Sequence, residues 1–157
     1  MFANRIRMPL SFVTIGLLFF VLEACMGTRP NNLGLHDGKL SPCPDKPNCV
    51  CSQCNSDDSH FIEPLKYQVD SATAWDKLIQ LVSETPRTAA VRLDSDYAHF
   101  ESTSFLFRFV DDVEFSHDKA TKLIHVRSAS RLGRSDLGVN RKRIEDIRSQ
   151  LAQNKEL

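Results

Sequence analysis

The sequence has no surplus of charge of either sign, because its 20 basic and 20 acidic residues cancel. A dedicated nucleic-acid binder needs a strong basic excess to neutralise phosphates, so no nucleic-acid partner is expected. The chain also lacks a glycine-rich phosphate loop, a His-Glu-x-x-His motif and a Gly-x-Ser-x-Gly motif. The common enzyme signatures are therefore missing, and no cofactor is expected.

The sequence also lacks an apolar run long enough to cross a bilayer. The run at residues 9–22 has 14 residues, whereas a spanning helix needs about 20. Arg5 and Arg7 precede it, which is typical of an export signal. With 157 residues in total, the chain has room for one domain after residues 1–24 are removed.

The signal ends in Leu22-Glu23-Ala24-Cys25, which resembles the lipobox of bacterial lipoproteins. The resemblance implies that Cys25 carries a lipid anchor with acyl chains such as palmitate. These chains would hold the protein on a membrane outside the cytoplasm. Glu23 departs from the pattern, which usually has a small or apolar residue there. In a Gram-negative host, the absence of Asp after Cys25 resembles the class sorted to the periplasmic face of the outer membrane. Secretory cleavage near Ala24 and an uncleaved signal anchor are the alternatives.

Four further cysteines lie within 12 residues: Cys43, Cys49, Cys51 and Cys54. Outside the cytoplasm an even number favours disulfides. Cys49 and Cys51 would close a very small ring, so we expect a Cys43–Cys49 bridge, with Cys51 and Cys54 either bridged or free. A zinc site and a redox Cys-x-x-Cys motif are the alternatives, but all the thiols share one short Pro-rich segment, which suits neither. No metal is therefore expected.

The remaining sequence predicts an α+β domain at residues 60–152, preceded by a tether and Cys- and Pro-rich loop at 25–59. Alternation predicts extended runs within 62–69 and at 88–93, 97–101, 106–115 and 122–130. Apolar spacing predicts one helix from Asp70 or Ser71 to Pro86 and another from Ser135 or Asp136, with Leu137 on its apolar stripe. We expect a twisted antiparallel sheet of four or five strands with two helices on one face.

Three runs resemble the domain of unknown function 1499 family of bacteria and plastids. They are CPDKPNC from Cys43 to Cys49, RFVDDVEF from Arg108 to Phe115, and IHVRSASRLGRSDLGVNR from Ile124 to Arg141. The resemblance covers roughly residues 40–151 and implies a small extracytoplasmic or membrane-associated domain without an established activity. Family members usually have Ser where this chain has Cys51. The resemblance therefore implies that Cys43–Cys49 is the disulfide common to the family.

Alternation in the strand at 106–115 and just before it points Phe105, Phe107, Phe109, Val113 and Phe115 towards the core. Arg108, Asp112 and Glu114 then face the other way, beside His125, Arg127 and Arg131 of the next strand. Asp111 breaks the alternation, so we expect a bulge near Val110 or a buried, paired carboxylate.

A helix N-terminus with nearby guanidinium groups can bind a phosphate or carboxylate. The candidate ligand-binding residues around the second helix start are Arg108, Arg127, Arg131, Arg134, Ser135, Asn140 and Arg141. The alternative is an exposed ladder of salt bridges, with Asp136 itself as the anion at the helix start.

Three classes of function follow. The first is a non-catalytic lipoprotein module that binds an anionic envelope component or a protein partner. The alternative is a hydrolase or transferase in which Asp111 or Asp112 orients His125 and the arginines hold an oxyanion. A redox or metal role for Cys51 and Cys54 is a third, weaker hypothesis.

The lipobox makes the first testable prediction. Cells that express the chain should incorporate a palmitate analogue into it, and the Cys25→Ser variant should lose this label because the acceptor thiol is gone. Gel fluorescence after metabolic labelling measures both. Equal labelling of the variant and the parent would contradict the lipid anchor.

Overall fold

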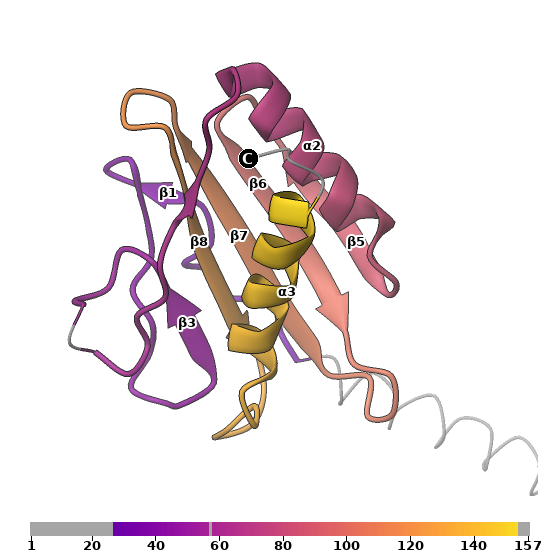
Figure 1. The fold of residues 1–157 in the computed structure, drawn as a ribbon. Helices are drawn as coiled ribbons and strands as arrows, with labels where there is room; N and C mark the ends of the chain where they lie inside the picture. The colour runs from indigo at the N-terminus through magenta and orange to yellow at the C-terminus, as the bar shows by residue number, and fades with distance from the viewer. Residues whose placement is uncertain (1–26, 57, 154–157) are drawn as a thin grey trace, which may run out of the picture.

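A computed structural model describes residues 27–56 and 58–153. The expected signal and Cys25 lie outside the described residues. Figure 1 shows a twisted antiparallel sheet with two helices on one face, as the sequence predicts. The sheet has six strands rather than four or five, because two short edge strands join it.

Four consecutive strands form the predicted meander. They are β5 (Thr88–Leu93), β6 (Tyr97–Thr103), β7 (Val110–Asp118) and β8 (Leu123–Ser130). The remaining edge of β8 pairs with β3 (Cys49–Cys51) near its end and with β4 (Leu65–Lys66) near its beginning. The expected run within 62–69 therefore contains only the two-residue strand β4.

Both predicted helices are present and bury one apolar stripe each against the sheet. Helix α2 (Ser71–Glu84) begins after Asp70, whose carboxylate accepts a hydrogen bond from the Thr73 amide at 3.0 Å, and ends before Pro86. The second helix is α3 (Val139–Gln153). The core between helices and sheet includes Trp75, Leu78, Phe100, Phe115, Ile144 and Leu151.

Helix α3 begins later than Ser135 or Asp136, which corrects the sequence prediction. The Asp136 carboxylate accepts hydrogen bonds from the amides of Gly138 at 3.0 Å and Asn140 at 2.8 Å. It therefore acts as the anion at the start of the helix. Leu137 precedes the helix with a left-handed φ of 54° and is 94% exposed, so it does not belong to the apolar stripe.

The strand expected at 106–115 begins only at Val110. Residues 104–109 form a loop closed by two hydrogen bonds between Ser104 and Phe109, and Arg108 within it has a left-handed φ of 57°. The loop does not continue the alternation of the strand. Phe105, Phe107 and Phe109 are consequently exposed, contrary to the prediction that they face the core.

Residues 27–56 and 58–59 are built into the domain instead of forming a tether. The hairpin of β1 (Leu35–His36) and β2 (Lys39–Leu40) lies against β7 and β8, and β3 adds a strand to the sheet. The sheet is therefore covered on both faces, by the helices on one side and by this N-terminal segment on the other (Figure 1).

Two disulfides fasten the N-terminal segment. Cys43 is bonded to Cys49, as predicted, and Cys51 is bonded to Cys54, with Cα–Cα distances of 5.7 and 5.5 Å. Cys49 lies opposite Ala129 in the sheet. The first bridge therefore ties the Pro-rich loop to the edge of β8.

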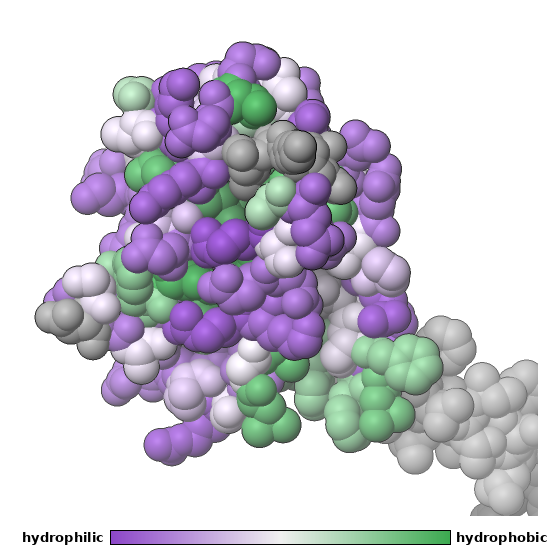
Figure 2. Space-filling model, in the orientation of Figure 1, coloured by the Kyte–Doolittle hydropathy of each residue, from purple (hydrophilic) through white to green (hydrophobic). Residues whose placement is uncertain are grey.

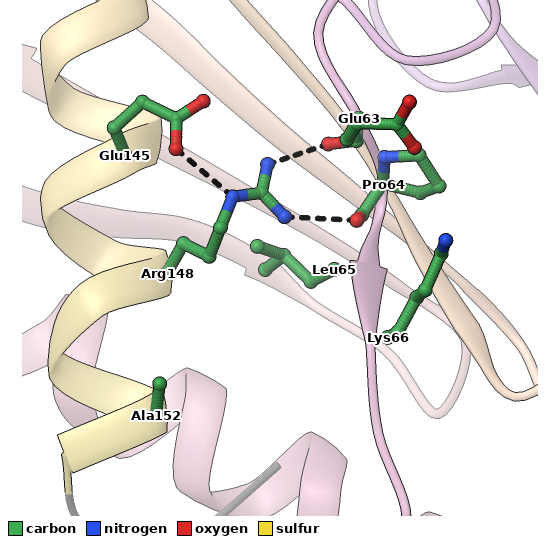
Figure 3. Close-up of a pocket in the computed structure, with 7 residues that line it drawn as sticks. All are labelled: Glu63, Pro64, Leu65, Lys66, Glu145, Arg148 and Ala152. Atoms are coloured by element: carbon green, nitrogen blue, oxygen red, sulfur yellow. Dashed lines mark hydrogen bonds and ion pairs between the residues drawn. The ribbon is translucent and has the colours of Figure 1, made fainter.

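A hollow of about 490 Å³ separates α3 from β4 (Figure 3). Arg148 crosses it and donates hydrogen bonds to the carbonyl oxygens of Glu63 at 2.6 Å and Pro64 at 2.9 Å, and a third to the Glu145 carboxylate at 3.0 Å. These bonds hold β4 against the helix. The polar groups of this hollow therefore have a structural role.

The Cys43–Cys49 bridge makes the second prediction. Replacing both residues by Ser should lower the free energy of unfolding by about 2–3 kcal/mol, because the unfolded chain regains the entropy of the short loop. Urea denaturation followed by circular dichroism measures the change. The double replacement of Cys51 and Cys54, which close a smaller ring, serves as a matched control with a smaller expected loss. Unchanged stability without Cys43–Cys49 would contradict the assignment.

Candidate functional site

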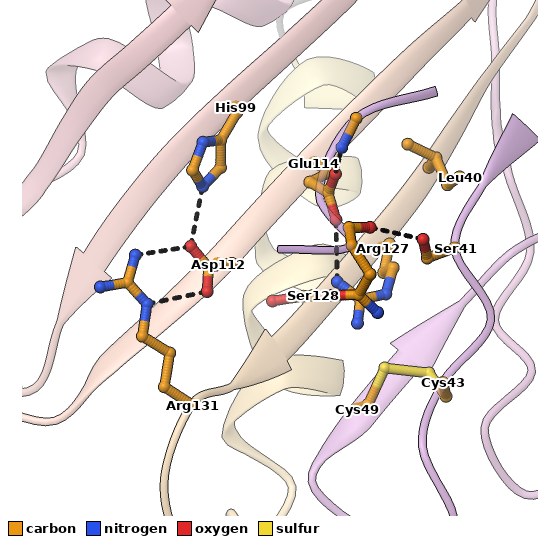
Figure 4. Close-up of polar contacts among 12 residues, drawn as sticks. Leu40, Ser41, Cys43, Cys49, His99, Asp112, Glu114, Arg127, Ser128 and Arg131 are labelled. Atoms are coloured by element: carbon orange, nitrogen blue, oxygen red, sulfur yellow. Dashed lines mark hydrogen bonds and ion pairs between the residues drawn. A yellow bond between two sulfur atoms is a disulfide. The ribbon is translucent and has the colours of Figure 1, made fainter. Parts of the chain in front are cut away.

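Alternate residues of the central strands place charged side chains on the sheet face away from the helices (Figure 4). We call this group the buried charged row. It consists of His99, Asp112, Glu114, Arg127 and Arg131. Each of these side chains is at most 5% exposed, because the N-terminal segment covers them.

Glu114 lies at the centre of the row and has no exposed surface. One carboxylate oxygen accepts hydrogen bonds from the Gly34 amide and the Tyr97 hydroxyl, both at 2.8 Å, and the other accepts from Arg127 at 2.8 Å. Burial, together with this carboxylate, raises the pKa of Tyr97 well above its usual value. Tyr97 therefore serves as a hydrogen-bond donor to Glu114.

Asp112 forms the second ion pair of the row. Its oxygens accept hydrogen bonds from Arg131 at 2.7 and 2.9 Å and from His99 at 2.8 Å. Burial opposes ionisation, yet the hydrogen bonds from Arg131 and His99 hold the pKa of Asp112 below its usual value. Arg131 also contacts Glu101, which Arg29 of the N-terminal segment binds at 2.6 Å. Asp112 is thus a fixed anion.

Among the described residues, His99, Glu101 and Asp112 are the one group close enough to hold a metal, with their ligand atoms within 4.8 Å of one another. Arg131 donates hydrogen bonds to both carboxylates of this group. A guanidinium therefore already neutralises the charge that a cation would otherwise bind. The group is an ion-pair network.

A hollow of about 430 Å³ lies beside the row, between the Pro-rich loop and the end of β8. Its lining includes Lys46, Asn48, Asp112, Arg127 and Arg131. Two buried atoms of this lining have no hydrogen-bond partner, namely Nε of Arg127 and Oδ1 of Asn48. Two residues of the lining therefore each keep one unpaired polar atom, a donor in Arg127 and an acceptor in Asn48, and cationic side chains outnumber acidic ones in the lining.

A family model described as a protein of unknown function (DUF1499) matches residues 39–151, well over half of the chain. The chain belongs to the DUF1499 family. The match begins within the β1–β2 hairpin, so the family domain includes most of the N-terminal segment that covers the buried charged row. No curated protein and no solved structure matches the chain.

In this DUF1499 domain the predicted pairing of His125 with Asp111 or Asp112 does not form. His125 lies opposite Ser116, four residues along β8 from the position opposite Asp112, and its ring contacts Ser52 at 3.2 Å. Burial lowers the pKa of His125. Its hydrogen-bond partner is a hydroxyl and not a carboxylate.

Asp111 lies on the opposite face of the sheet and confirms the predicted alternative of a buried, paired carboxylate. Arg143 of α3 donates a hydrogen bond to it at 2.6 Å and also contacts Ser128 and Asn140. The irregularity in strand pairing lies in β5, between Ala90 and Arg92, and not near Val110.

The predicted anion-binding residues do not converge. Arg127 and Arg131 line the hollow, whereas Asn140 lies on the helix side of the sheet, where Ser128, Ser130 and the Asn48 carbonyl satisfy it. Arg141 binds the carbonyl oxygens of Ser59 and Phe61 at 2.9 and 2.7 Å. Arg108, Arg134 and Ser135 lie exposed in loops. The predicted residues therefore do not form one group at the helix start, where the Asp136 carboxylate accepts the amide hydrogen bonds instead.

Sequence reasoning missed His99, Tyr97 and Glu101 of β6 and Asn48 of the Pro-rich loop. The signal for the first three is alternation, which points all of them to the face shared with Asp112 and Glu114. No comparable signal marks Asn48, because loop geometry alone brings it to the end of β8.

Neither helix in the described part of the chain is long and apolar enough to cross a membrane.

The carboxylates of the row make the third prediction. Folding lowers the pKa values of Asp112 and Glu101 from their unfolded values of 3.8 and 4.5. The two carboxylates therefore stabilise the folded protein above these pH values. This stabilisation is lost as the pH falls through the lower pKa values of the folded state. Urea denaturation across this interval should show the free energy of unfolding falling chiefly below about pH 4. The Asp112→Asn variant should show a shallower fall, and an equal slope would contradict the assignment.

Proposed function

We propose that this DUF1499 protein is a lipid-anchored, non-catalytic envelope protein that binds a small anionic ligand in the hollow beside the buried charged row. The observation that carries the proposal is that Arg127 lines the hollow and keeps one buried donor, Nε, without a hydrogen-bond partner. An unpaired buried donor typically costs about 1–3 kcal/mol. A ligand oxygen that accepts from it therefore gains binding free energy.

The charges of the lining favour an anion. Arg127 and Arg131 are compensated within the row by Glu114 and by Asp112 with Glu101, whereas Lys46 adds an exposed ammonium group at the rim. Asn48 offers an acceptor, so a carboxylate or phosphate compound that also carries a hydroxyl or amide donor fits both free atoms.

The separation of the predicted acid and base supports binding without catalysis. The hydrolase or transferase alternative needed Asp111 or Asp112 with His125, and these residues are held apart. Asp112 pairs with His99 instead, and this pair is at least 95% buried and also binds Arg131. Asp112 lines the hollow, but both of its carboxylate oxygens already accept hydrogen bonds from Arg131.

The proposed address is the membrane surface outside the cytoplasm, through the lipid on Cys25. Two disulfides in the folded domain support export, because such bonds persist in oxidising compartments. In a Gram-negative host this address is the periplasmic face of the outer membrane.

The fourth prediction tests the hollow. Titration of the isotope-labelled protein, as purified, with inorganic phosphate at constant ionic strength should shift the Nε–Hε signal of Arg127. Lys46→Glu reverses the charge at the rim, and we expect it to weaken binding about fivefold. Nuclear magnetic resonance follows the signal and gives the affinity of each variant.

Lys66→Glu is the matched control, because Lys66 is also an exposed lysine and lies on strand β4, outside the lining of the hollow. It should leave the affinity unchanged. An Arg127 signal that does not move with phosphate, or moves equally in all three proteins, would contradict the anion site.

A further inference from the structure

Large apolar side chains are exposed at one end of the sheet. Four of them lie in the β6–β7 loop and one precedes α3; we call them the apolar tip. They are Phe105 (79% exposed), Leu106 (74%), Phe107 (62%), Phe109 (40%) and Leu137 (94%). Figure 2 shows apolar side chains gathered at this end, on a surface that is otherwise mainly hydrophilic.

The tip is held in place by specific contacts. Ser104 and Phe109 close the loop with hydrogen bonds of 2.8 and 2.9 Å. The rings of Phe107 and Phe109 stack with centroids 5.6 Å apart, and the Arg87 guanidinium lies 5.6 Å from the centre of the Phe105 ring. The side chains are therefore presented to the surroundings by an ordered loop.

The tip lies at the end of the sheet where the described chain begins. The Arg131 amide, just after β8, donates a hydrogen bond to Val110 at the start of β7. Gly27 lies beside Arg131 and Leu132, so close that a Cβ on Gly27 would be 3.0 and 3.1 Å from them. Cys25 is only two residues earlier, and two residues span at most about 7 Å.

We propose that the apolar tip inserts into the interfacial layer of the membrane that holds the protein. This inference rests on the proposed lipid anchor, because acyl chains on Cys25 bring the bilayer to this end of the domain. Exposed aromatic and leucine side chains gain free energy at a lipid–water boundary. The anchor and the tip then fix the orientation of the domain as two separate contacts.

The charges around the tip suit an anionic lipid surface. Arg87, Arg108 and Arg134 are exposed at this end, and the segment 102–110 contains no acidic residue. Guanidinium groups bind lipid phosphates, while the neighbouring rings enter the acyl boundary. A lipid surface therefore matches both the apolar and the charged part of the tip.

The fifth prediction uses tryptophan fluorescence. The Leu106→Trp variant is purified from membranes and reconstituted in vesicles of phosphatidylethanolamine and phosphatidylglycerol with brominated acyl chains. We expect its emission to be quenched at least about twofold relative to vesicles without bromine, because bromine quenches only at short range. The unmodified chain, with Trp75 buried in the core, supplies the background.

Lys119→Trp is the matched control, since Lys119 is exposed in the β7–β8 turn at the other end of the sheet. It should show no added quenching. If both variants remain unquenched, or if gel filtration shows that a second copy of the chain covers the tip, the insertion is overturned. Palmitate labelling of Cys25 in the same samples reports on the anchor alone. A labelled but unquenched protein contradicts the insertion of the tip, whereas an unlabelled protein contradicts the lipid anchor.

Discussion

The burial of one carboxylate determines how the two sides of this sheet are organised. Glu114 has no contact with solvent, and a buried charge deprived of its partner costs about 3–5 kcal/mol. Arg127, directly opposite on β8, and the Gly34 amide both satisfy it. The first contact fixes the strand register, because a slip of one residue would turn Arg127 into the apolar core. The second brings the N-terminal segment onto the sheet.

Local patterns predicted most of the fold. The cap at Asp70, the spacing of α2 and the antiparallel order of β5 to β8 depend on near neighbours, and these predictions are confirmed. Predictions failed where a side chain or turn overrides periodicity. The bonds between Ser104 and Phe109 end the alternation early, and the Asp136 cap delays α3. The role of residues 27–59 depended on distant contacts that local sequence does not encode.

The charges of the candidate site were partly predictable. Alternation correctly placed Arg127 and Arg131 beside Glu114 and Asp112. Alternation could not show whether these salt bridges are exposed or buried. A strand has the same polar alternation whether water or another segment of the chain covers that face. The identity of the histidine paired with Asp112 depends on the position of β6, which only the assembled sheet determines.

The Cys43–Cys49 disulfide makes the shape of the hollow depend on whether the surroundings are oxidising or reducing. Cys43 lines the hollow, and its bond to Cys49 secures that wall to β3. In a reducing compartment the wall would lose its covalent tie, while the helices and the meander would keep their own hydrogen bonds and core. A copy in such a compartment would keep its sheet and helices and lack the covalent support of the hollow. If the protein is exported as we propose, this bond would form only after the chain leaves the cytoplasm, and the wall of the hollow would be fixed only there.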